Sequence, residues 1–586
     1  MASFTTFFLK YNTVILFVCL TVIILKQMLL PGYILTLDMV WADNLTWSPN
    51  TNSFTNTAPV HLFLGSLGLI FPSWLVQKFM LFGLFFSLMY IPYRFLPFIE
   101  SNYGRLFAGM LYTLNPFVYA RLLAGQWGVL LGYACFPLVL YTLNRLLNKR
   151  DLKSGLLYGL ALTLVGSVSI HFLYLSVALS IVWIGAYMVK FLLYDRSSIS
   201  RSLLASCLSG LLLFLLLSTY WLVPAFTRET PLETRFDAAH FEGFAASENH
   251  LVSTLLNLSV LGGFWAEGEE WRYYFIWPQD QVLFWVAAAL ILSLVAFGLL
   301  TLIRDSKRRF VGLLLLGIGT LSYILALGAW GGIFTSFNLW IYETISGWSG
   351  LRDSHKIAGV LALVYVTLAG IGVDRLVALS KKGPSWITTV LPIIFALPLL
   401  FGMYELFGFR GQLTPVDYPA SWHEARQVLS ATPDTEKMLV LPWQGYFSLP
   451  FNNQLIVSNP TSRFFGKEKV FAGRSVEVGD IYDQEADPTY RAWDTFLHEV
   501  PTLPLETIVD TLRQHDITYL FVIVNPEVED QNLWLVPAIT TPEASTSTDF
   551  VVDPKEANVI KALLQVPNQL LIDSDVILYR FTYSDM

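Results

Sequence analysis

Long apolar runs constrain this chain more than any other feature of its sequence. Stretches of about 20 residues with few charges recur from residue 12 to residue 408. An α-helix of that length crosses a bilayer core of about 30 Å with its backbone hydrogen bonds satisfied. The sequence therefore predicts an α-helical polytopic membrane domain with about eleven transmembrane helices, over residues 12–30, 74–94, 103–119, 128–147, 154–171, 172–193, 203–224, 281–303, 310–330, 356–378 and 386–408.

The distribution of charge divides the chain in two. Only 14% of the residues are charged, against about 25% in an average soluble protein, and the deficit lies before residue 409. We therefore expect a transmembrane domain over 1–408 and a second, globular domain over 409–586. The net charge of −7 provides no basic field for nucleic acid. The three cysteines all lie in apolar runs, which argues against disulfides and thiolate metal sites.

Basic residues predict the orientation of the chain. Cytoplasmic loops are the ones enriched in Lys and Arg, and the segment 31–73 contains neither. We therefore expect a multi-pass protein of the cell (plasma) membrane with a cytoplasmic N-terminus and an extracytoplasmic 409–586 domain. The long loops 31–73, 225–280 and 331–355 then lie on the outer side. The basic clusters of the inner connections are Arg94 and Arg105; Arg145, Lys149, Arg150 and Lys153; Lys190, Arg196 and Arg201; Arg304, Lys307, Arg308 and Arg309; and Arg375, Lys381 and Lys382.

Residues 409–586 have the pattern of an α/β domain. Ala420–Ser430 has helical spacing, and 508–524 predicts an amphipathic helix followed by a buried strand. The last run, Gln569–Phe581, predicts a hairpin that turns at 573–575. Short runs of branched and aromatic residues predict strands, at Met438–Pro442, Leu455–Ser458 and Tyr519–Val524.

Two acidic residues, Asp38 and Asp43, follow the first apolar run. A carboxylate at the outer membrane boundary can act as a general base, or it can hold a divalent cation such as Mg²⁺, Mn²⁺ or Ca²⁺ against a phosphate. The alternative is a solvated interfacial carboxylate. Lys26 and Lys78 lie near the ends of the two helices that bracket this loop. Each either contacts a phosphate or extends its stem to the membrane interface.

Further polar residues lie at the same expected face. Arg121 and Gln126 follow Asn115-Pro116. Arg121 either clamps a lipid phosphate with its planar guanidinium group or pairs with a carboxylate or a helix C-terminus. His171 lies at the turn between two expected helices, where it is either a polar cap or a hydrogen-bond partner for a substrate.

The segment Gly350-Leu-Arg-Asp-Ser-His-Lys precedes another expected helix. Arg352, His355 and Lys356 at a helix N-terminus form an anion site, since unpaired amide groups add to their charge. Asp353 or Ser354 can at the same time cap that helix. No nucleophile elbow, phosphate-binding Gly-Lys-Ser/Thr loop or Cys/His metal spacing occurs in the sequence.

Taken together, these features resemble the GT-C glycosyltransferase superfamily. The more specific likeness is to arabinofuranosyltransferase-like and YfhO-like membrane proteins of bacteria and archaea. It spans most of the chain, although its motifs are diffuse. The stretches that carry it are Tyr112-Thr-Leu-Asn-Pro-Phe-Val-Tyr-Ala-Arg-Leu-Leu-Ala-Gly-Gln-Trp-Gly, Leu351-Arg-Asp-Ser-His-Lys, and the run from Leu441-Pro-Trp through Ser458-Asn-Pro.

The resemblance implies transfer of a sugar from a polyprenyl-phosphate donor to a glycan, lipid or protein acceptor on the outer membrane face. A first-loop acidic residue then serves as the base or the metal contact, which maps onto Asp38, with Asp43 as the alternative. The loop lacks the paired Asp-x-Asp or Glu-x-Asp pattern, which puts the metal in doubt. A non-catalytic envelope polysaccharide assembly protein is the alternative. A lipid or polymer transporter is disfavoured, because the expected helices carry few charges at their centres.

Overall fold

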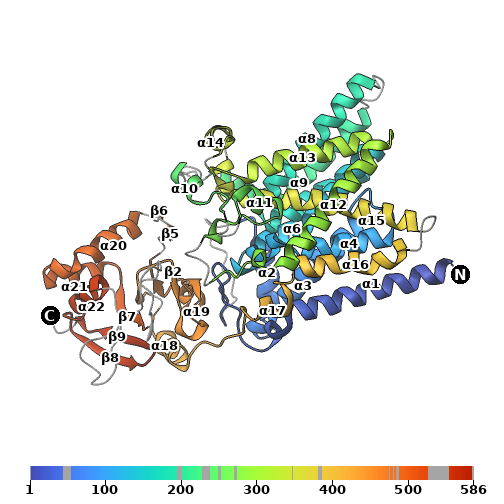
Figure 1. The fold of residues 1–586 in the computed structure, drawn as a ribbon. Coiled ribbons are helices and arrows are strands. Elements are labelled where there is room, and N and C mark those ends of the chain that lie inside the picture. Colours follow the sequence, from blue (N-terminus) through green and yellow to red (C-terminus); the bar gives the residue numbers. More distant parts are fainter. Residues whose placement is uncertain are drawn as a thin grey trace. The chain divides into compact units, whose positions relative to one another are not determined.

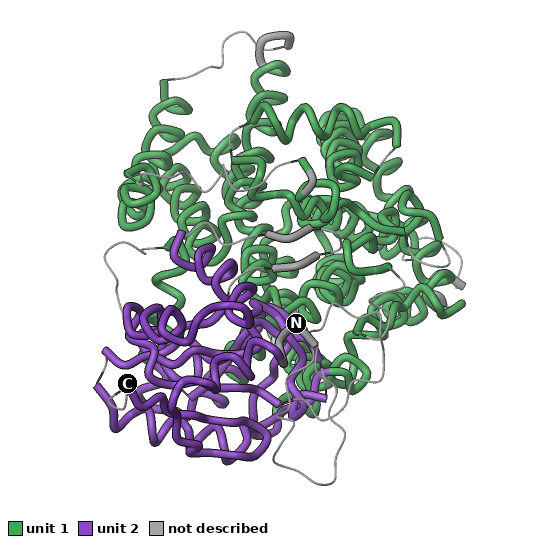
Figure 2. The backbone as a smooth tube through the Cα atoms, turned by 90° about the vertical axis from the view of Figure 1, so that its left-hand side faces the viewer, with its two compact units in different colours: residues 1–29, 47–66, 78–412 green, residues 30–46, 67–77, 413–586 purple. Residues whose placement is uncertain are grey.

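The computed structural model describes two compact units (Figure 2). Unit 1 comprises residues 1–29, 47–66 and 78–412, and unit 2 comprises 30–46, 67–77 and 413–586. The described residues are 2–43, 55–194, 201–227, 238–248, 252–268, 274–330, 332–345, 347–380, 386–433, 435–453, 455–473, 476–478, 481–483, 488–524 and 554–583.

Unit 1 is built almost entirely of helices (Figure 1). Residues 67–68 of α2 and 73–77 of α3 belong to unit 2. The helices in chain order are α1 (Ala2–Leu25), η1 (Lys26–Leu29), α2 (Ala58–Gly68), α3 (Ser73–Phe95), α4 (Asn102–Thr113), α5 (Pro116–Leu123), α6 (Trp127–Lys149), α7 (Leu152–Val168), α8 (Ile170–Tyr194), α9 (Arg201–Thr227), α10 (Ala238–Gly243), α11 (Thr254–Ser259), η3 (Trp265–Glu267), η5 (Pro278–Asp280), α12 (Val282–Arg304), α13 (Arg309–Ala326), α14 (Thr335–Thr344), η6 (Trp348–Leu351), η7 (Ser354–Ile357), α15 (Ala358–Ser380), α16 (Trp386–Phe401) and α17 (Leu406–Arg410).

Eight helices in the described part of the chain are long and apolar enough to cross a membrane. They confirm eight of the expected spans, but the predicted total is not confirmed. The predicted helix 103–119 is broken into α4 and α5. The predicted helices 154–171 and 386–408 are shorter than expected, since α7 has 17 residues and α16 ends at Phe401.

Asn115 and Pro116 explain the break between α4 and α5. Proline has no backbone N–H, so it leaves the carbonyl of Tyr112 without its helical donor. The side-chain amide of Asn115 donates to that carbonyl at 2.9 Å and to the carbonyl of Leu111 at 3.0 Å. The same side chain accepts from the amide of Val118 at 3.2 Å, so it also caps α5.

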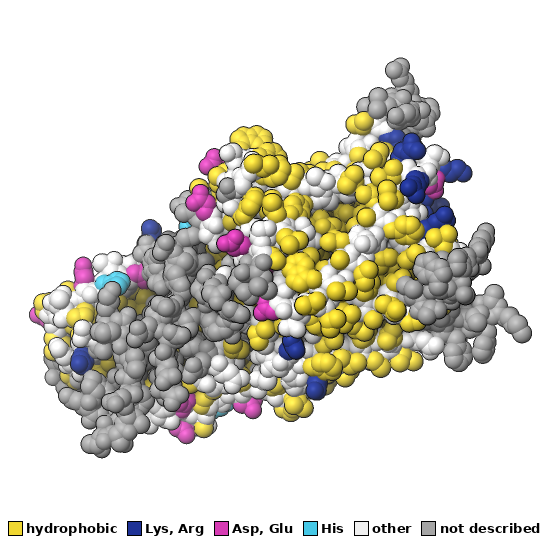
Figure 3. Space-filling view, in the orientation of Figure 1, with side chains coloured by type: hydrophobic (Ala, Val, Ile, Leu, Met, Phe, Trp, Pro, Cys, Tyr) yellow, Lys and Arg dark blue, Asp and Glu magenta, His cyan; other side chains and the backbone are white. Residues whose placement is uncertain are grey.

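The outward-facing side chains of unit 1 are apolar. Leu216 on α9 is 68% exposed and Ile181 on α8 is 67% exposed. Figure 3 shows hydrophobic side chains covering the helices on the face in view, with Lys and Arg gathered at one end of them. A contiguous apolar surface of this kind is the surface that a lipid bilayer covers.

Several connections meet at this basic end of unit 1. The guanidinium group of Arg308 donates to the carbonyl of Phe98 at 2.7 Å. The carboxylate of Asp374 accepts from the amide of Glu100 at 2.6 Å and from the hydroxyl of Ser101. The loops before α4 and before α13 therefore lie together with the end of α15. The side of the membrane that this end faces stays a prediction.

Glycines allow the longest helices of unit 1 to pack closely. A Cβ atom on Gly298 of α12 would lie 1.9 Å from the carbonyl oxygen of Leu368 on α15. A Cβ atom on Gly372 of α15 would lie 2.5 Å from the carbonyl oxygen of Leu294 on α12. Small residues at a helix interface let two backbones approach each other, which is the main way in which helices associate in lipid.

Unit 2 contains a five-stranded mixed sheet of order β4-β1-β7-β9-β8. β1 pairs in parallel with β4 and β7, and β9 pairs antiparallel with β7 and β8. The strands are β1 (Lys437–Leu441), β2 (Tyr446–Ser448), β3 (Ile456–Ser458), β4 (Val470–Phe471), β5 (Val476–Val478), β6 (Ile481–Asp483), β7 (Ile517–Ile523), β8 (Asn568–Asp573) and β9 (Val576–Phe581). The helices are α18 (Ala420–Ser430), η8 (Pro450–Asn452), α19 (Thr461–Phe465), α20 (Pro488–Glu499), η9 (Val500–Thr502), α21 (Leu505–Gln514) and α22 (Pro554–Leu563).

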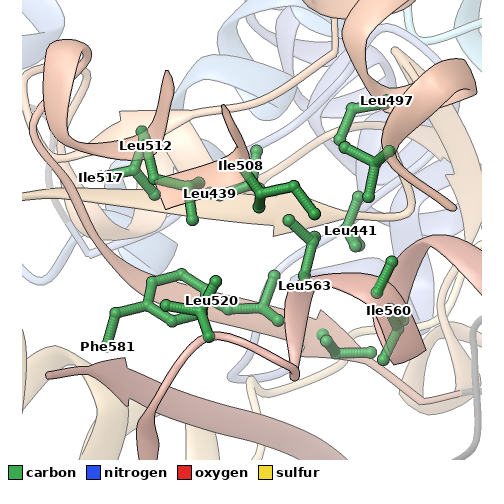
Figure 4. Packing of buried hydrophobic residues seen from close by; sticks show 14 of the residues in the cluster. Leu439, Leu441, Leu497, Ile508, Leu512, Ile517, Leu520, Ile560, Leu563 and Phe581 are labelled. Carbon is green, nitrogen blue, oxygen red and sulfur yellow. The ribbon is translucent and has the colours of Figure 1, made fainter. Parts of the chain in front are cut away.

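The sequence predicted these elements well. The expected helix at 420–430 is α18, the helix-strand pair at 508–524 is α21 and β7, and the C-terminal hairpin is β8 and β9. Figure 4 shows how the apolar side chains of the sheet and its helices meet in one core. Leu439 and Leu520 on the sheet pack with Ile508 on α21 and Leu563 on α22, and all four are at most 1% exposed.

The first segment after α1 belongs to unit 2. The backbone of Tyr33 exchanges hydrogen bonds with Val416, with N···O distances of 2.7 and 2.9 Å. Leu37 forms a parallel bridge to β3, with N···O distances of 3.1 Å to Ile456 and 2.8 Å to Ser458. Two parts of the predicted outer loop 31–73, residues 31–46 and 67–73, therefore belong to this unit. Whether 1–408 and 409–586 fold as separate domains stays a prediction.

Candidate functional site

Unit 1 holds a buried polar cluster around Arg121. The side chain of Arg121 is 0% exposed and lies near the end of α5. Both terminal nitrogens bond the carboxylate of Asp353, with Nη2···Oδ1 at 2.9 Å and Nη1 in contact with Oδ2. Nη1 also donates to Gln126 Oε1 at 2.7 Å. This is the two-pronged geometry that a planar guanidinium group makes with a carboxylate.

Aromatic rings enclose the same guanidinium group. Its carbon lies 4.9 Å from the ring centre of Phe264 and 5.5 Å from that of Phe117. The negative face of an aromatic ring attracts a cation, and the attraction is stronger when water is excluded. Arg121 is thus fixed by a carboxylate and by two rings. Of its two predicted roles, the structure shows the pairing with a carboxylate, and direct contact with a phosphate stays a prediction.

Asp353 and His355 enter the cluster just before α15. Asp353 is the N-cap residue of η7, but its side chain makes no cap hydrogen bond. Its carboxylate instead binds Arg121, and its Oδ2 lies 3.6 Å from the ammonium group of Lys356. Burial alone raises the pKa of Asp353, but the charges of Arg121 and Lys356 outweigh it and hold that pKa well below its usual value. His355 Nε2 lies 3.2 Å from the carbonyl of Leu261, so Nε2 carries the proton and Nδ1 accepts from Arg121 at 3.0 Å.

His171 and Arg352 complete the set of predicted residues in this unit. His171, at the start of α8, lies within electrostatic reach of Lys356, Asp353, Arg121 and Arg352. Its Nδ1 atom is buried and has no hydrogen-bond partner among the described residues. The guanidinium carbon of Arg352 lies 5.2 Å from the ring centre of Phe244. The structure therefore brings six predicted side chains together around one carboxylate, namely Arg121, Gln126, His171, Arg352, His355 and Lys356.

The cluster gathers three cationic side chains, Arg121, Arg352 and Lys356, near the carboxylate of Asp353. Arg121 forms a bidentate pair with Asp353, and the ammonium group of Lys356 lies 3.6 Å from the same carboxylate. Positive charge at a largely buried site attracts an anion strongly, because little solvent screens it.

Unit 2 holds the two predicted acidic residues. Asp38 lies at the tip of a tight turn in which Thr36 and Met39 exchange backbone hydrogen bonds of 3.2 and 2.7 Å. Leu37 has a positive φ of 33°, a conformation that disfavours a side chain, and the backbone pairing with β3 holds it there. Asp38 is exposed, and its Oδ1 accepts from the hydroxyl of Tyr446 at 2.5 Å.

Asp43 has a different environment. Its Oδ1 accepts from the hydroxyl of Tyr33 at 2.5 Å, and its Oδ2 accepts from Arg426 of α18 at 2.7 Å. Burial raises the pKa of Asp43, but the hydrogen bonds from Tyr33 and Arg426 outweigh it and leave the pKa below its usual value. Asp43 therefore stays ionised and links the first segment of unit 2 to α18. This environment is less suitable for a general base than that of Asp38.

The residues of this segment do not form a cation site of their own. No three His, Cys, Asp or Glu side chains converge anywhere in the described ranges. One oxygen of Asp43 is taken by Arg426, whose positive charge opposes a second cation. A protein site for a hard divalent cation needs several oxygen ligands. We therefore derive no step through a metal ion.

Sequence reasoning missed the partner of Arg121. Asp353 lies 232 positions away in the chain, and in the sequence it was assigned only to a helix cap. The one available signal was the position of Asp353 next to Arg352, His355 and Lys356. A carboxylate near the membrane pairs with a cation, so this position indicated a charge pair for Asp353. The role of Tyr446 beside Asp38 had no signal in the sequence.

Comparison with known proteins shows the fold. No family model matches the chain, and no curated protein matches it. The arabinofuranosyltransferase AftD from Mycobacteria superposes with a TM-score of 0.63 at 15% identity, over 98% of this chain and 40% of AftD. A mutant of AftD superposes with a TM-score of 0.60 at 15% identity, over 97% of this chain and 41% of that one. The chain therefore has a GT-C-like membrane glycosyltransferase fold, as the sequence predicted, and is a multi-pass membrane protein.

This chain spans about two fifths of the length of AftD. The archaeal oligosaccharyltransferase AglB from Archaeoglobus fulgidus, in complex with an inhibitory peptide and a dolichol-phosphate, superposes with a TM-score of 0.46 at 12% identity, over 88% of this chain and 69% of AglB. We draw no argument from that weaker likeness.

Proposed function

We propose that this chain transfers a sugar from a polyprenyl-phosphate donor to a glycan, lipid or protein acceptor on the outer face of the membrane. The observation that carries the proposal is the superposition on the membrane arabinofuranosyltransferase AftD over 98% of the chain. The donor and acceptor classes come from the resemblance of the sequence. The placement of the reaction comes from the positive-inside bias, with the N-terminus in the cytoplasm and residues 409–586 outside.

The reaction needs a base for the acceptor and positive charge for the departing phosphate. The acceptor oxygen forms a bond to the anomeric carbon while the bond from that carbon to the phosphate oxygen breaks. The acceptor proton passes to a carboxylate, and the polyprenyl phosphate leaves with the electron pair. A positioned base contributes about 10²–10⁴-fold to such a step. Preorganised cations stabilise the charge that develops on the leaving group.

Asp38 is the residue that we assign as the base. It is exposed at the tip of its turn, whereas Asp43 is held by Arg426. The backbone strain at Leu37 supports the assignment, because strained residues concentrate at functional positions. Lys356 and Arg352 are the residues that we assign to the phosphate, since both are cationic side chains beside the buried Arg121–Asp353 pair. Gln126, His171 and His355 then line and orient this anion site.

The test is sugar transfer by membranes that contain the Asp38→Asn variant, supplied with a panel of polyprenyl-phosphate sugars. We expect a loss of about 10²–10⁴-fold in kcat. Asp417→Asn is the matched control, because Asp417 is an exposed carboxylate of the same unit, and it should keep full activity. Undiminished transfer by Asp38→Asn at equal expression would rule out the role of the base.

The phosphate assignment has its own measurement. Lys356→Gln should raise the KM for the donor. The KM for the acceptor should stay unchanged. An unchanged KM for the donor would remove Lys356 from the donor site. The orientation is checked separately by attaching a membrane-impermeant label to a cysteine introduced near residue 580. Labelling only after the cells are broken open would contradict the outer location.

A non-catalytic role in envelope polysaccharide assembly is the second candidate. The observation that favours it is that Arg121 and Asp43 are already bound to other side chains of the protein. It predicts that no polyprenyl-phosphate sugar is consumed, whichever acceptor is supplied. It also predicts that the Asp38→Asn variant complements a deletion strain as well as the unchanged protein does.

A further inference from the structure

A cavity of about 540 Å³ lies at the end of α1 in unit 1. We call it the Lys26 cavity. Lys26 and Arg410 contribute its charged walls, and the side chains of Gln27, Met403, Leu406 and Phe407 contribute the rest of the wall with Gly411. It lies apart from the residues of the Arg121 cluster, none of which lines it.

The two cations of the Lys26 cavity lack acidic partners. No Asp or Glu lines the cavity. Lys26 and Arg410 are both exposed, and neither makes a side-chain hydrogen bond or an ion pair with any residue that the structure describes. Each of the two cations lies over an aromatic ring, with the ammonium group of Lys26 5.3 Å from the ring centre of Phe407 and the guanidinium carbon of Arg410 4.5 Å from that of Tyr404.

The backbone around the cavity holds these groups in an unusual conformation. The run from Phe407 to Gly411 has positive φ throughout, with values from 53° to 83°. Three of these residues carry side chains, and each costs about 1–2 kcal/mol in this left-handed conformation. The turn places Arg410 at the cavity and leaves the ring of Phe407 51% exposed beside Lys26. Strained backbone of this kind concentrates at functional positions, ligand sites among them.

An exposed apolar stripe runs along α1 toward the cavity. Ile15 is 58% exposed, Val18 is 37% exposed and Val22 is 45% exposed. These residues and Lys26 follow one another at spacings of three or four, which places them on one face of the helix. Lys26 also lies inside the span Asn12–Leu29 that is apolar enough to cross the membrane. A lysine at that depth extends its charged end to the headgroup layer while the stripe below it contacts acyl chains.

We propose that the Lys26 cavity binds the phosphate headgroup of an anionic membrane phospholipid, with an acyl chain lying along the Ile15–Val22 face of α1. The two unpaired cations supply the attraction, Phe407 separates the headgroup from water, and the apolar stripe receives the chain. This site is additional to the proposed transfer reaction and does not depend on it. A lipid bound at this site would anchor the Lys26 end of α1 in the headgroup layer.

The experiment measures lipids bound to the purified protein by native mass spectrometry, with phosphatidylglycerol as the probe. Each cation near a membrane surface contributes about fivefold to the binding of an anionic lipid. We therefore expect the double variant Lys26→Gln/Arg410→Gln to bind phosphatidylglycerol about 25-fold more weakly. The matched control is Lys307→Gln/Arg309→Gln, which removes two exposed cations outside the Lys26 cavity, one just before α13 and one at its first residue, and should bind as the unchanged protein does.

Three further measurements distinguish a phospholipid headgroup from other phosphate ligands. Zwitterionic phosphatidylcholine should bind more weakly than phosphatidylglycerol, and inorganic phosphate at millimolar concentration should not displace the lipid. Polyprenyl phosphate should not displace it at equal concentration either. Equal binding of phosphatidylglycerol to the two double variants would overturn the proposal. So would displacement by inorganic phosphate, which would indicate a free-anion site, or by polyprenyl phosphate, which would indicate a donor site.

Discussion

The buried pair of Arg121 and Asp353 makes the strongest prediction about stability. Replacing Asp353 with alanine leaves the guanidinium group of Arg121 in a site where it is 0% exposed. Two hydrogen bonds to the carboxylate are lost, and Gln126 and His355 remain as the hydrogen-bond partners of Arg121 among the described residues. Removing one member of a buried ion pair costs about 3–5 kcal/mol, because the remaining charge is neither solvated nor paired.

Two controls test whether the loss of stability comes from the unpaired buried charge. The double variant Arg121→Met/Asp353→Leu removes both charges and fills a similar space, so it should recover most of the lost stability. The pair of Arg308 and Glu100 has its charged groups 3.2 Å apart, but its side chains are 30% and 80% exposed. Glu100→Gln should therefore cost no more than about 0.5–1 kcal/mol.

The assay is denaturant unfolding of the detergent-purified protein, followed by tryptophan fluorescence. The midpoint shift between each variant and the unchanged protein gives the difference in unfolding free energy when the slope is unchanged. A cost for Asp353→Ala as small as that of Glu100→Gln would refute the reasoning. It would show that water reaches Arg121 and that the pair behaves as a surface ion pair.

Three other predictions follow from single contacts. Gly298→Ala should destabilise the protein by more than about 2 kcal/mol in the same assay, since its Cβ would lie 1.9 Å from a carbonyl oxygen of α15, whereas Gly317→Ala, with nothing within 4 Å, should not. Burial raises the pKa of Glu267 to about 7 from 4.5, so the folded state binds more protons between these values. Its contribution to stability is therefore full below pH 4.5 and is lost as the pH rises toward 7, and Glu267→Gln should remove at most ~3 kcal/mol of that pH dependence. Asp43→Ala should cost only about 1 kcal/mol, because its pair with Arg426 is 41% and 32% exposed.

Much of the candidate site was visible in the sequence as separate motifs. The segment around Lys356 indicated an anion site, and the segment around Arg121 indicated either a phosphate contact or a charge pair. The structure brings the two segments together through Asp353. Asp38 and Asp43 could not be ranked from the sequence, because both are acidic residues in one loop. Their ranking came from Arg426 and Tyr446, which lie in strands and helices more than 380 residues further along the chain.

The sequence by itself determined the membrane class, the long helices and the α/β elements of the C-terminal unit. Each of these follows from local periodicity or from local composition. A helix that spans a bilayer must be apolar along its whole length, so its own sequence is enough to identify it. The break at Asn115-Pro116 is also a local effect, yet its consequence was missed, since hydropathy alone does not register a missing backbone donor.

Only the tertiary structure decided the charge partners and the composition of the units. The pairing of Arg121 with Asp353 and the assignment of residues 30–46 to unit 2 both join segments hundreds of residues apart. A buried charge takes whichever opposite charge the fold brings to it, and a backbone edge pairs with whichever strand lies beside it. Neither choice leaves a trace in the spacing of residues along one chain.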